Sequence, residues 1–424
     1  MKISAQKTPV LKKYKDLFYL LSAFAIYNLF FINKAFHIDD GFTISAARDI
    51  KTNILSVFHT GYSNPPLLGL YYAPIIKIFG ESEISMHLFY LPFSLLAVVA
   101  MYFLSLRFTQ KAWLPTLSLV VTPAFIIMSQ NVMLDIPLLG FFLASLALFI
   151  NGIDKDNKKL LFLSAILSGA TILVKYTGLL LIPIMFFYAL LSGKKKYLLF
   201  LLIPIFIFLL WGICNIISHK NFPFVQALFF RICGISGEVI LKRVFACLSF
   251  TSGTSLTLLF ISALIVLARK DFLLVLFSCL GGLCPFLFKS IFGEYPLIER
   301  ILLAFLFIAS SFLMLSMLKL FLSSSLKKTA DKDRQFIFVW FFIVLLFNVL
   351  SQFVSARFIL LLFPPMLLFL CDSVIINKIN SSSLIKKSMV VVYIIVFLLS
   401  TVLAIGDYRF AGAYRGFVRY LKKN

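Results

Sequence analysis

Long apolar runs, separated by short polar loops, constrain the fold of this chain more than any other feature. Of its 424 residues, 61% are hydrophobic and 13% are charged, whereas soluble globular domains are about half apolar and about a quarter charged. A run of about twenty apolar residues is long enough to cross a bilayer as a helix. We therefore expect an all-α polytopic membrane protein.

The apolar runs are numerous enough for about thirteen membrane spans. They are expected near residues 15–33, 83–107, 112–129, 133–151, 159–175, 177–192, 197–217, 244–268, 272–291, 298–321, 335–352, 356–376 and 386–406. The two short runs on either side of Lys175 and Tyr176 could instead form one re-entrant hairpin. We expect residues 1–406 to form a single membrane domain, followed by a short basic tail at 407–424.

Lysine and arginine gather in every second loop, as in Lys194-Lys195-Lys196. Cytoplasmic loops carry such an excess of basic residues, so the net charge of +23 reflects orientation in the membrane and predicts no nucleic-acid partner. The other loops, including 34–82 and 218–243, should face outward. The tail would then lie on the outer side of the membrane, although its basic residues favour the cytoplasmic side. Contact with anionic headgroups, or one missed or extra span, would resolve this conflict.

The first outer loop, residues 34–82, is expected to be folded. Apolar residues that recur every four positions predict a short helix lying at the membrane surface; they are Phe42, Ala46, Ile50 and Ile54. The apolar run 67–79 is too short to span and predicts a second helix, which Asn64 caps and Gly80 ends. The prolines at 65 and 66 suit the first turn of this helix. Together the two helices would form a shelf on the outer membrane surface, which suits a substrate with a lipid tail and a polar head.

Asp39 and Asp40 lie side by side where the chain leaves the first span. Carboxylates at a membrane surface cost desolvation energy unless they are paired or used. A single aspartate at a helix start is commonly an N-cap, but one cap is enough. The adjacent pair therefore points to a chemical role.

Five short motifs resemble those of GT-C glycosyltransferases, in particular the protein mannosyltransferase and lipid A aminoarabinose transferase group. They are Asp39 to Asp49, Asn64-Pro65-Pro66 with Phe79 to Glu83, Met133 to Pro137, Leu173 to Gly178, and Arg357-Phe358 with Pro364-Pro365. Their order and spacing together make the resemblance specific over the N-terminal part of the chain, and Arg357 extends it further.

The resemblance implies a GT-C fold and an enzyme that moves a sugar from a polyprenyl-phosphate donor to an acceptor, with inversion at the anomeric carbon. It implies an active site on the non-cytoplasmic side of a multi-pass membrane protein, and the short loops favour a bacterial inner membrane. Asp39 matches the catalytic carboxylate, Asp40 its acidic partner and Asp135 a second acidic site residue. The acceptor would be a glycolipid, an envelope polysaccharide or a protein.

A divalent metal stays an open question, and no cofactor is certain. In the aminoarabinose enzymes an acidic-basic pair precedes the first loop proline, and its acidic member contributes to metal binding. Ser63 and Asn64 occupy those positions here. The six cysteines form no CxxC pair, and no histidine lies at metal-ligand spacing.

Glycosyl transfer by displacement needs a base for the acceptor hydroxyl and positive charge beside the departing phosphate. We favour Arg357 for the phosphate, followed by Lys175, because both lie at outer ends of predicted spans. Single cations at such positions are equally expected to snorkel to lipid headgroups. Arg48, Asn64 and Tyr176 are further candidates for substrate binding, since they belong to the same motifs.

A membrane transporter or lipid flippase is the alternative function. Transporters carry charged groups at mid-span and broken helices in two matching halves, whereas here the charges gather at span ends and no repeat is visible. A scaffold without enzymatic activity gives no reason for Asp39 and Asp40. Within the enzyme class, protein O-mannosyltransferase is the second hypothesis.

Overall fold

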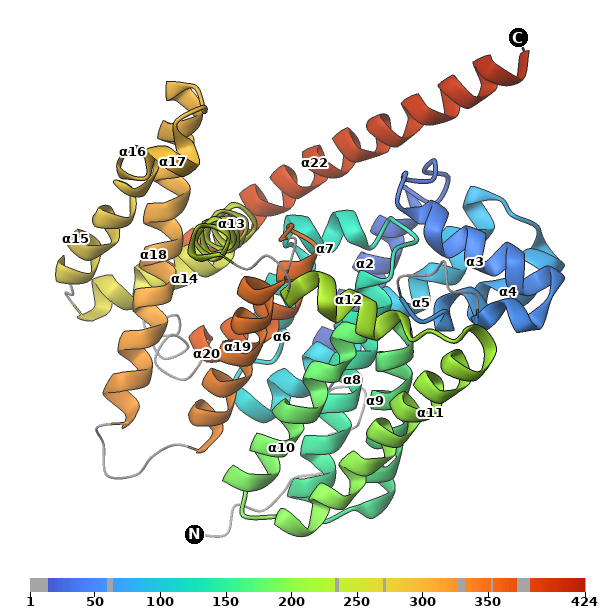
Figure 1. The fold of residues 1–424 in the computed structure, drawn as a ribbon. Coiled ribbons are helices and arrows are strands. Elements are labelled where there is room, and N and C mark those ends of the chain that lie inside the picture. The colour runs from blue at the N-terminus through green and yellow to red at the C-terminus, as the bar shows by residue number, and fades with distance from the viewer. Residues whose placement is uncertain are drawn as a thin grey trace.

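The computed structural model describes residues 14–58, 64–232, 236–269, 272–325, 332–351, 354–371 and 382–423. Over these ranges the chain forms helices and no strand, which confirms the predicted all-α class (Figure 1). An apolar chain favours this outcome because a helix satisfies its backbone hydrogen bonds within one segment, without help from water.

The helices of the first half include those of the predicted first outer loop. In order they are α2 (Lys15–Leu29), α3 (Asp40–Thr52), η1 (Ile54–Phe58), α4 (Leu67–Phe79), α5 (Glu83–Phe108), α6 (Trp113–Val120), α7 (Pro123–Met128), α8 (Asp135–Asp154), α9 (Lys158–Val174), η2 (Tyr176–Leu180), α10 (Leu181–Leu191), η3 (Lys195–Leu201) and α11 (Leu202–His219).

The second half begins with short helices and ends with long ones. They are α12 (Pro223–Ile232), α13 (Gly237–Thr254), α14 (Leu256–Arg269), α15 (Phe272–Gly281), α16 (Cys284–Leu287), α17 (Lys289–Phe292), α18 (Leu297–Ser325), α19 (Lys332–Leu350), η4 (Phe358–Leu362), α20 (Phe363–Leu370) and α22 (Ser383–Lys423).

Six helices among the described residues are long and apolar enough to cross a membrane, and a bent pair raises the number to seven. The bent pair joins α13 to α14 at an angle of 83°. Several predicted spans are divided: 112–129 forms α6 and α7, for example. Pro123 begins α7, and its missing N–H prevents α6 from continuing through it. The predicted number of about thirteen spans therefore stays a prediction.

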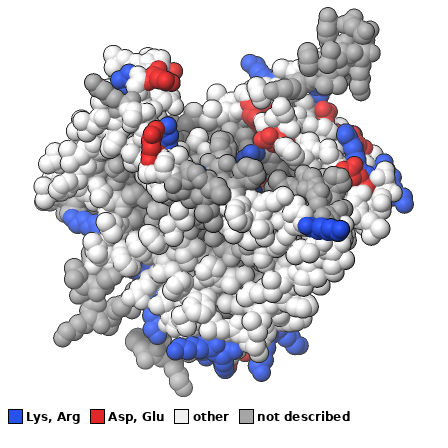
Figure 2. Space-filling model, in the orientation of Figure 1, with Lys and Arg blue, Asp and Glu red and all other residues white. Residues whose placement is uncertain are grey.

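The two ends of the helical body differ in charge. Lysine and arginine dominate the lower end in Figure 2, where Figure 1 shows the turns that join α8 to α9 and α10 to η3. We call this the lysine-rich end. The upper end, which carries α3 and α4 and toward which α22 runs, shows both signs of charge. We call it the mixed-charge end. This difference agrees with the predicted alternation of basic loops.

The core lies around α8, which packs against α5 and α9. Of the candidate spans, α8 is the most buried, with 83% of its apolar window inside the molecule. Gly140 brings α8 close to α5, since a Cβ there would lie 2.8 Å from the carbonyl oxygen of Phe93. Small residues permit such close helix contacts in membranes, so this position fixes how the two helices cross.

Both helices predicted in the first outer loop are present, as α3 and α4. Gly80 ends α4 with a φ of 74°, which glycine adopts without strain. The predicted cap was wrong: the N-cap position of α4 is Pro66, and no side chain caps it. Pro65 and Pro66 thus precede the helix, and Asn64 lies before them.

The predicted apolar stripe of α3 was only half right. Ala46 and Ile50 are buried against Gly69 of α4, but Phe42 is 76% exposed. Ile54, which is 63% exposed, lies beyond the end of α3, in η1. A helix turns once in about 3.6 residues, so a strict spacing of four drifts off the buried face.

The helix α22 runs without a break from Ser383 to Lys423, so the predicted boundary between residues 406 and 407 falls inside it. Its second half contacts residues that flank the first outer loop. Arg415 pairs with Glu83 at 2.8 Å and donates to the carbonyl oxygen of Asn33, also at 2.8 Å. At least one basic residue of the tail, Arg415, therefore pairs with a carboxylate of the protein, whereas the sequence suggested that the tail contacts anionic lipid headgroups.

Candidate active site

Asp39 and Arg357 meet at the mixed-charge end although 318 residues separate them. Asp39 directly precedes α3, and Arg357 directly precedes η4. The Arg357 Nη1 donates a hydrogen bond to Asp39 Oδ2 at 2.7 Å. The two side chains are 35% and 27% exposed, so the pair is accessible to a ligand while the surrounding protein limits its freedom.

Lys175 and Asp135 form a second pair beside the first. The Lys175 Nζ lies 2.8 Å from Asp135 Oδ1 and 4.4 Å from the ring centre of Phe358. The Arg357 guanidinium lies 5.4 Å from the same ring. An aromatic face attracts cations at such distances, so Phe358 joins the two pairs. We call Asp39, Arg357, Phe358, Lys175 and Asp135 the ion-pair chain.

Helix ends explain how these residues reach the site. Asp135 is the first residue of α8, where a carboxylate is favoured by the helix dipole. Lys175 has an extended backbone between α9 and η2, so its side chain leaves the helix end. The break at Lys175 and Tyr176 that the sequence indicated thus supplies one cation of the site.

Asp40 has a different environment from its neighbour Asp39. It is fully buried, and its Oδ2 accepts a hydrogen bond from the backbone N–H of His37 at 2.8 Å. Its Oδ1 has no hydrogen-bond partner among the described residues. Burial raises the pKa of Asp40 to about 7. No part of this side chain reaches the surface, so Asp40 contacts only the surrounding protein in this structure, and its predicted role in substrate binding stays a prediction.

Lys34, Asn131 and Asp407 form a buried group next to this loop, which the sequence analysis missed. Lys34 is fully buried; its Nζ donates to Asn131 Oδ1 at 2.5 Å and forms an ion pair with Asp407. The Asn131 side chain also donates to Asp407, at 3.1 Å. Asp407 offered one signal in the sequence, because it directly follows an apolar run. An acidic residue in that position is costly in a membrane and is therefore expected to have a partner.

Three predicted substrate-binding residues lie apart from the ion-pair chain. Arg48 pairs with Glu81 on the exposed side of α3. Asn64 lines a small cavity between α3 and α4, of about 50 Å³. The Tyr176 hydroxyl accepts a hydrogen bond from Trp211 at 3.3 Å; its ring is buried among Phe208, Phe222 and Phe224. We interpret Tyr176 as a packing residue, since its hydroxyl and ring both face protein.

No group of three or more histidine, cysteine, aspartate or glutamate side chains that could hold a metal occurs within the described residues. Ser63, which occupies the family's acidic metal position, lies outside these residues. Within the ion-pair chain each aspartate faces a lysine or arginine.

Comparisons with known proteins agree with the motifs. Residues 63–213 match the sequence model of the family described as dolichyl-phosphate-mannose-protein mannosyltransferase. No curated protein matches the sequence.

Two solved structures of ArnT from Cupriavidus metallidurans are similar to the chain at low identity. The apo structure gives a TM-score of 0.45 at 14% identity and covers 84% of this chain and 76% of that one. The structure bound to undecaprenyl phosphate gives 0.46 at 15%, covering 87% and 79%. It is the family match that confirms, across residues 63–213, the resemblance predicted from the motifs, and it identifies the chain as a membrane glycosyltransferase.

Proposed function

We propose that the protein transfers a sugar from a polyprenyl-phosphate donor to an acceptor, and that this occurs at the mixed-charge end, facing away from the cytoplasm. The observation that carries the proposal is the ion-pair chain. It sets a carboxylate and two cations together in a partly exposed site. A lipid phosphate as donor also agrees with the family description, in which the sugar is carried on dolichyl phosphate.

Asp39 acts as the base in the proposed reaction. As the acceptor oxygen attacks the anomeric carbon, its proton passes to the Asp39 carboxylate. The bond from that carbon to the phosphate oxygen breaks, and polyprenyl phosphate leaves with the electron pair. Because the acceptor enters opposite the leaving group, the configuration at the anomeric carbon inverts.

Arg357 and Lys175 stabilise the charge that develops on the departing phosphate. The donor phosphate takes the place of Asp39 as the partner of Arg357, which leaves the carboxylate able to receive the acceptor proton. Asp135 holds Lys175 in place through their 2.8 Å contact. Asp40 fixes the backbone that carries Asp39, because its carboxylate accepts a hydrogen bond from the backbone N–H of His37.

The acceptor in this proposal is a glycolipid or an envelope polysaccharide, in a bacterial inner membrane. A protein acceptor is the second candidate, and the family description favours it. Exposed apolar side chains on the α3 and α4 shelf, among them Phe42 and Ile78, suit contact with lipid. The rival function, a transporter or flippase, is not favoured because the charged residues of the site all lie at helix ends.

The test compares the wild type with Asp39→Asn in vesicles loaded with a polyprenyl-phosphate sugar. We expect the variant to lose transfer by about 10²- to 10⁴-fold, the typical contribution of a general base, with normal insertion. The measured quantity is free polyprenyl phosphate released per unit time.

Asp49→Asn is the matched control, because Asp49 is an exposed aspartate of α3, the helix that Asp39 precedes. It should retain wild-type turnover. Transfer at the wild-type rate by Asp39→Asn would remove Asp39 from the mechanism. Movement of intact donor between leaflets, without cleavage, would favour the flippase.

A further inference from the structure

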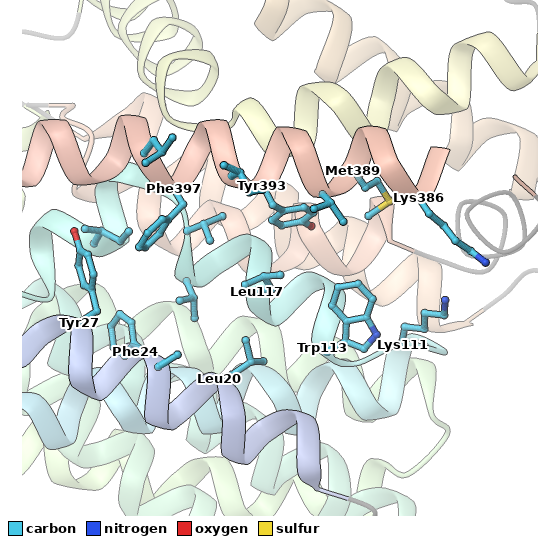
Figure 3. Close-up of a pocket in the computed structure, with 17 residues that line it drawn as sticks. Leu20, Phe24, Tyr27, Lys111, Trp113, Leu117, Lys386, Met389, Tyr393 and Phe397 are labelled. Atoms are coloured by element: carbon cyan, nitrogen blue, oxygen red, sulfur yellow. The ribbon is translucent and has the colours of Figure 1, made fainter. Parts of the chain in front are cut away.

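An apolar groove runs along the first half of α22, where this helix faces α2, α6 and α7 (Figure 3). Its volume of about 570 Å³ lies in the range of about 300 to 1,000 Å³ that is typical of ligand sites. Apolar side chains make up most of its walls, among them Leu20, Phe24, Leu117, Met389 and Phe397. None of its lining residues belongs to the ion-pair chain, so it is a separate site.

Two lysines stand together at one end of this groove. Lys111 precedes α6 and Lys386 lies in the first turn of α22, and Figure 3 shows both side chains at the same end, next to Trp113. Both belong to the basic loops that the sequence assigns to the cytoplasmic side. Tryptophan is favoured at the boundary between headgroups and acyl chains. The groove therefore begins at headgroup level.

The length of the groove corresponds to one leaflet. From Lys386 to Leu398 the helix α22 rises by about 18 Å, at about 1.5 Å per residue, and half of the hydrocarbon core measures about 15 Å. Tyr27 lies at the end opposite the lysines (Figure 3) and donates to Thr401 at 3.4 Å. A ligand that begins at the lysines would thus end near the middle of the bilayer.

We propose that this groove binds an anionic phospholipid from the leaflet at the lysine-rich end. One acyl chain lies between α2 and α22, and the headgroup phosphate lies between Lys111 and Lys386. Apolar contact alone selects no lipid, because bulk acyl chains are equally apolar. Selectivity comes from the two lysines, since each basic residue near the surface attracts anionic lipid. This proposal is independent of the proposed sugar transfer.

The test uses the full chain in phosphatidylcholine vesicles that contain a trace of photoreactive phosphatidylglycerol. We expect crosslinks in peptides from α2 and the first half of α22, and excess phosphatidylglycerol should suppress them. The double variant Lys111→Gln/Lys386→Gln should lower the apparent affinity roughly 30-fold, because each lysine contributes about fivefold. Lys155→Gln/Lys158→Gln is the control, since these lysines are exposed at the same end but line no part of the groove.

A second variant tests the apolar part of the groove and does not depend on the lysines. Ala23 is exposed and lines the groove from α2, so Ala23→Phe fills the space without entering the core. It should abolish the crosslinks, whereas Ser22→Phe on the neighbouring face should retain them.

Three results would overturn the proposal. Crosslinking that persists in both the lysine and Ala23 variants would show that the lipid binds elsewhere. Equal competition by phosphatidylcholine would remove the selectivity. Competition by polyprenyl phosphate, or crosslinking of a second copy of the chain through the groove, would assign a different occupant.

Discussion

The two ends of the molecule use charged residues differently. At the mixed-charge end, cations meet carboxylates that are distant in the sequence: Lys34 with Asp407, Arg357 with Asp39, and Lys175 with Asp135. At the lysine-rich end, Lys194 and Lys196 share one acidic partner, Asp156, at 3.8 and 3.3 Å. The lysine-rich end also has a pair that is distant in the sequence, Arg107 with Asp333. The two ends therefore differ in the grouped lysines, which orient the chain in the membrane.

The paired side chains at the two ends also differ in how far they are buried. The side chains of the three pairs at the mixed-charge end are between 0% and 35% exposed, whereas Lys194, Lys196 and Asp156 are between 42% and 61% exposed. Exposed ion pairs contribute little to stability, but a buried charge that loses its partner is costly. Equivalent substitutions at the two ends should therefore give unequal results.

The largest expected effect follows from breaking the buried pair. Lys34→Met leaves Asp407 without its cation and should lower the free energy of unfolding by about 3 to 5 kcal/mol. Reversible unfolding in mixed micelles measures this. The double variant Lys34→Met/Asp407→Leu should recover most of the loss, because it removes both charges. Additive losses in the double variant would show that the pair is not coupled.

Charge reversal at Arg357 should affect the reaction more than the fold. Arg357→Glu removes a cation from the departing phosphate, and we expect transfer to fall by about 10²- to 10³-fold, the usual loss for one stabilising group. Turnover at several donor concentrations measures the change. Lys194→Glu, at the opposite end, should leave turnover unchanged. An unaltered rate and donor Michaelis constant in Arg357→Glu would mean that Arg357 only contacts headgroups.

Asp40 should make stability depend on pH. Its folded pKa of about 7 exceeds the usual value of a free aspartate, so the folded state binds a proton more tightly than the unfolded state. The resulting stabilisation is complete at acidic pH and is lost as the pH rises toward and through 7, with a slope of up to about 1.4 kcal/mol per pH unit. Asp40→Asn should flatten this part of the profile, as monitored by thermal unfolding between pH 5 and 8.

The smallest effect is expected at the lysine-rich end. Lys196→Met breaks an exposed pair and should change the free energy of unfolding by about 0 to 1 kcal/mol. The same micelle assay applies as for Lys34→Met. A loss comparable to that of Lys34→Met would erase the difference between the two ends.

Local sequence signals accounted for the elements whose structure is local. The apolar run before Gly80 predicted α4, and the acidic pair marked the start of α3. The motifs also named both partners of two ion pairs, Asp39 with Arg357 and Lys175 with Asp135, although the pairing itself was not predicted. Family resemblance supplied these residues, because nothing in the residues alone relates positions 39 and 357.

Tertiary packing determined what the sequence left open. Successive helix residues point about 100° apart, so Asp39 and Asp40 face different surroundings, and only the packed structure shows which one is buried. The pairing of Lys34 with Asp407 spans 373 residues. This pair was not predicted, because the apolar run ends at residue 406 and a separate tail was predicted from residue 407. The helix continues beyond residue 406, and Asp407 and Arg415 pair there with Lys34 in the first outer loop and with Glu83 next to it.

The central claim is that Arg357 and Lys175 bind the donor phosphate beside Asp39. A polyprenyl phosphate with a photoreactive group next to its phosphate tests this directly, with crosslinked peptides mapped by mass spectrometry. We predict crosslinks in residues 34–58 and 354–371 that Arg357→Glu abolishes. Crosslinks confined to the lysine-rich end, or unchanged by Arg357→Glu, would contradict it.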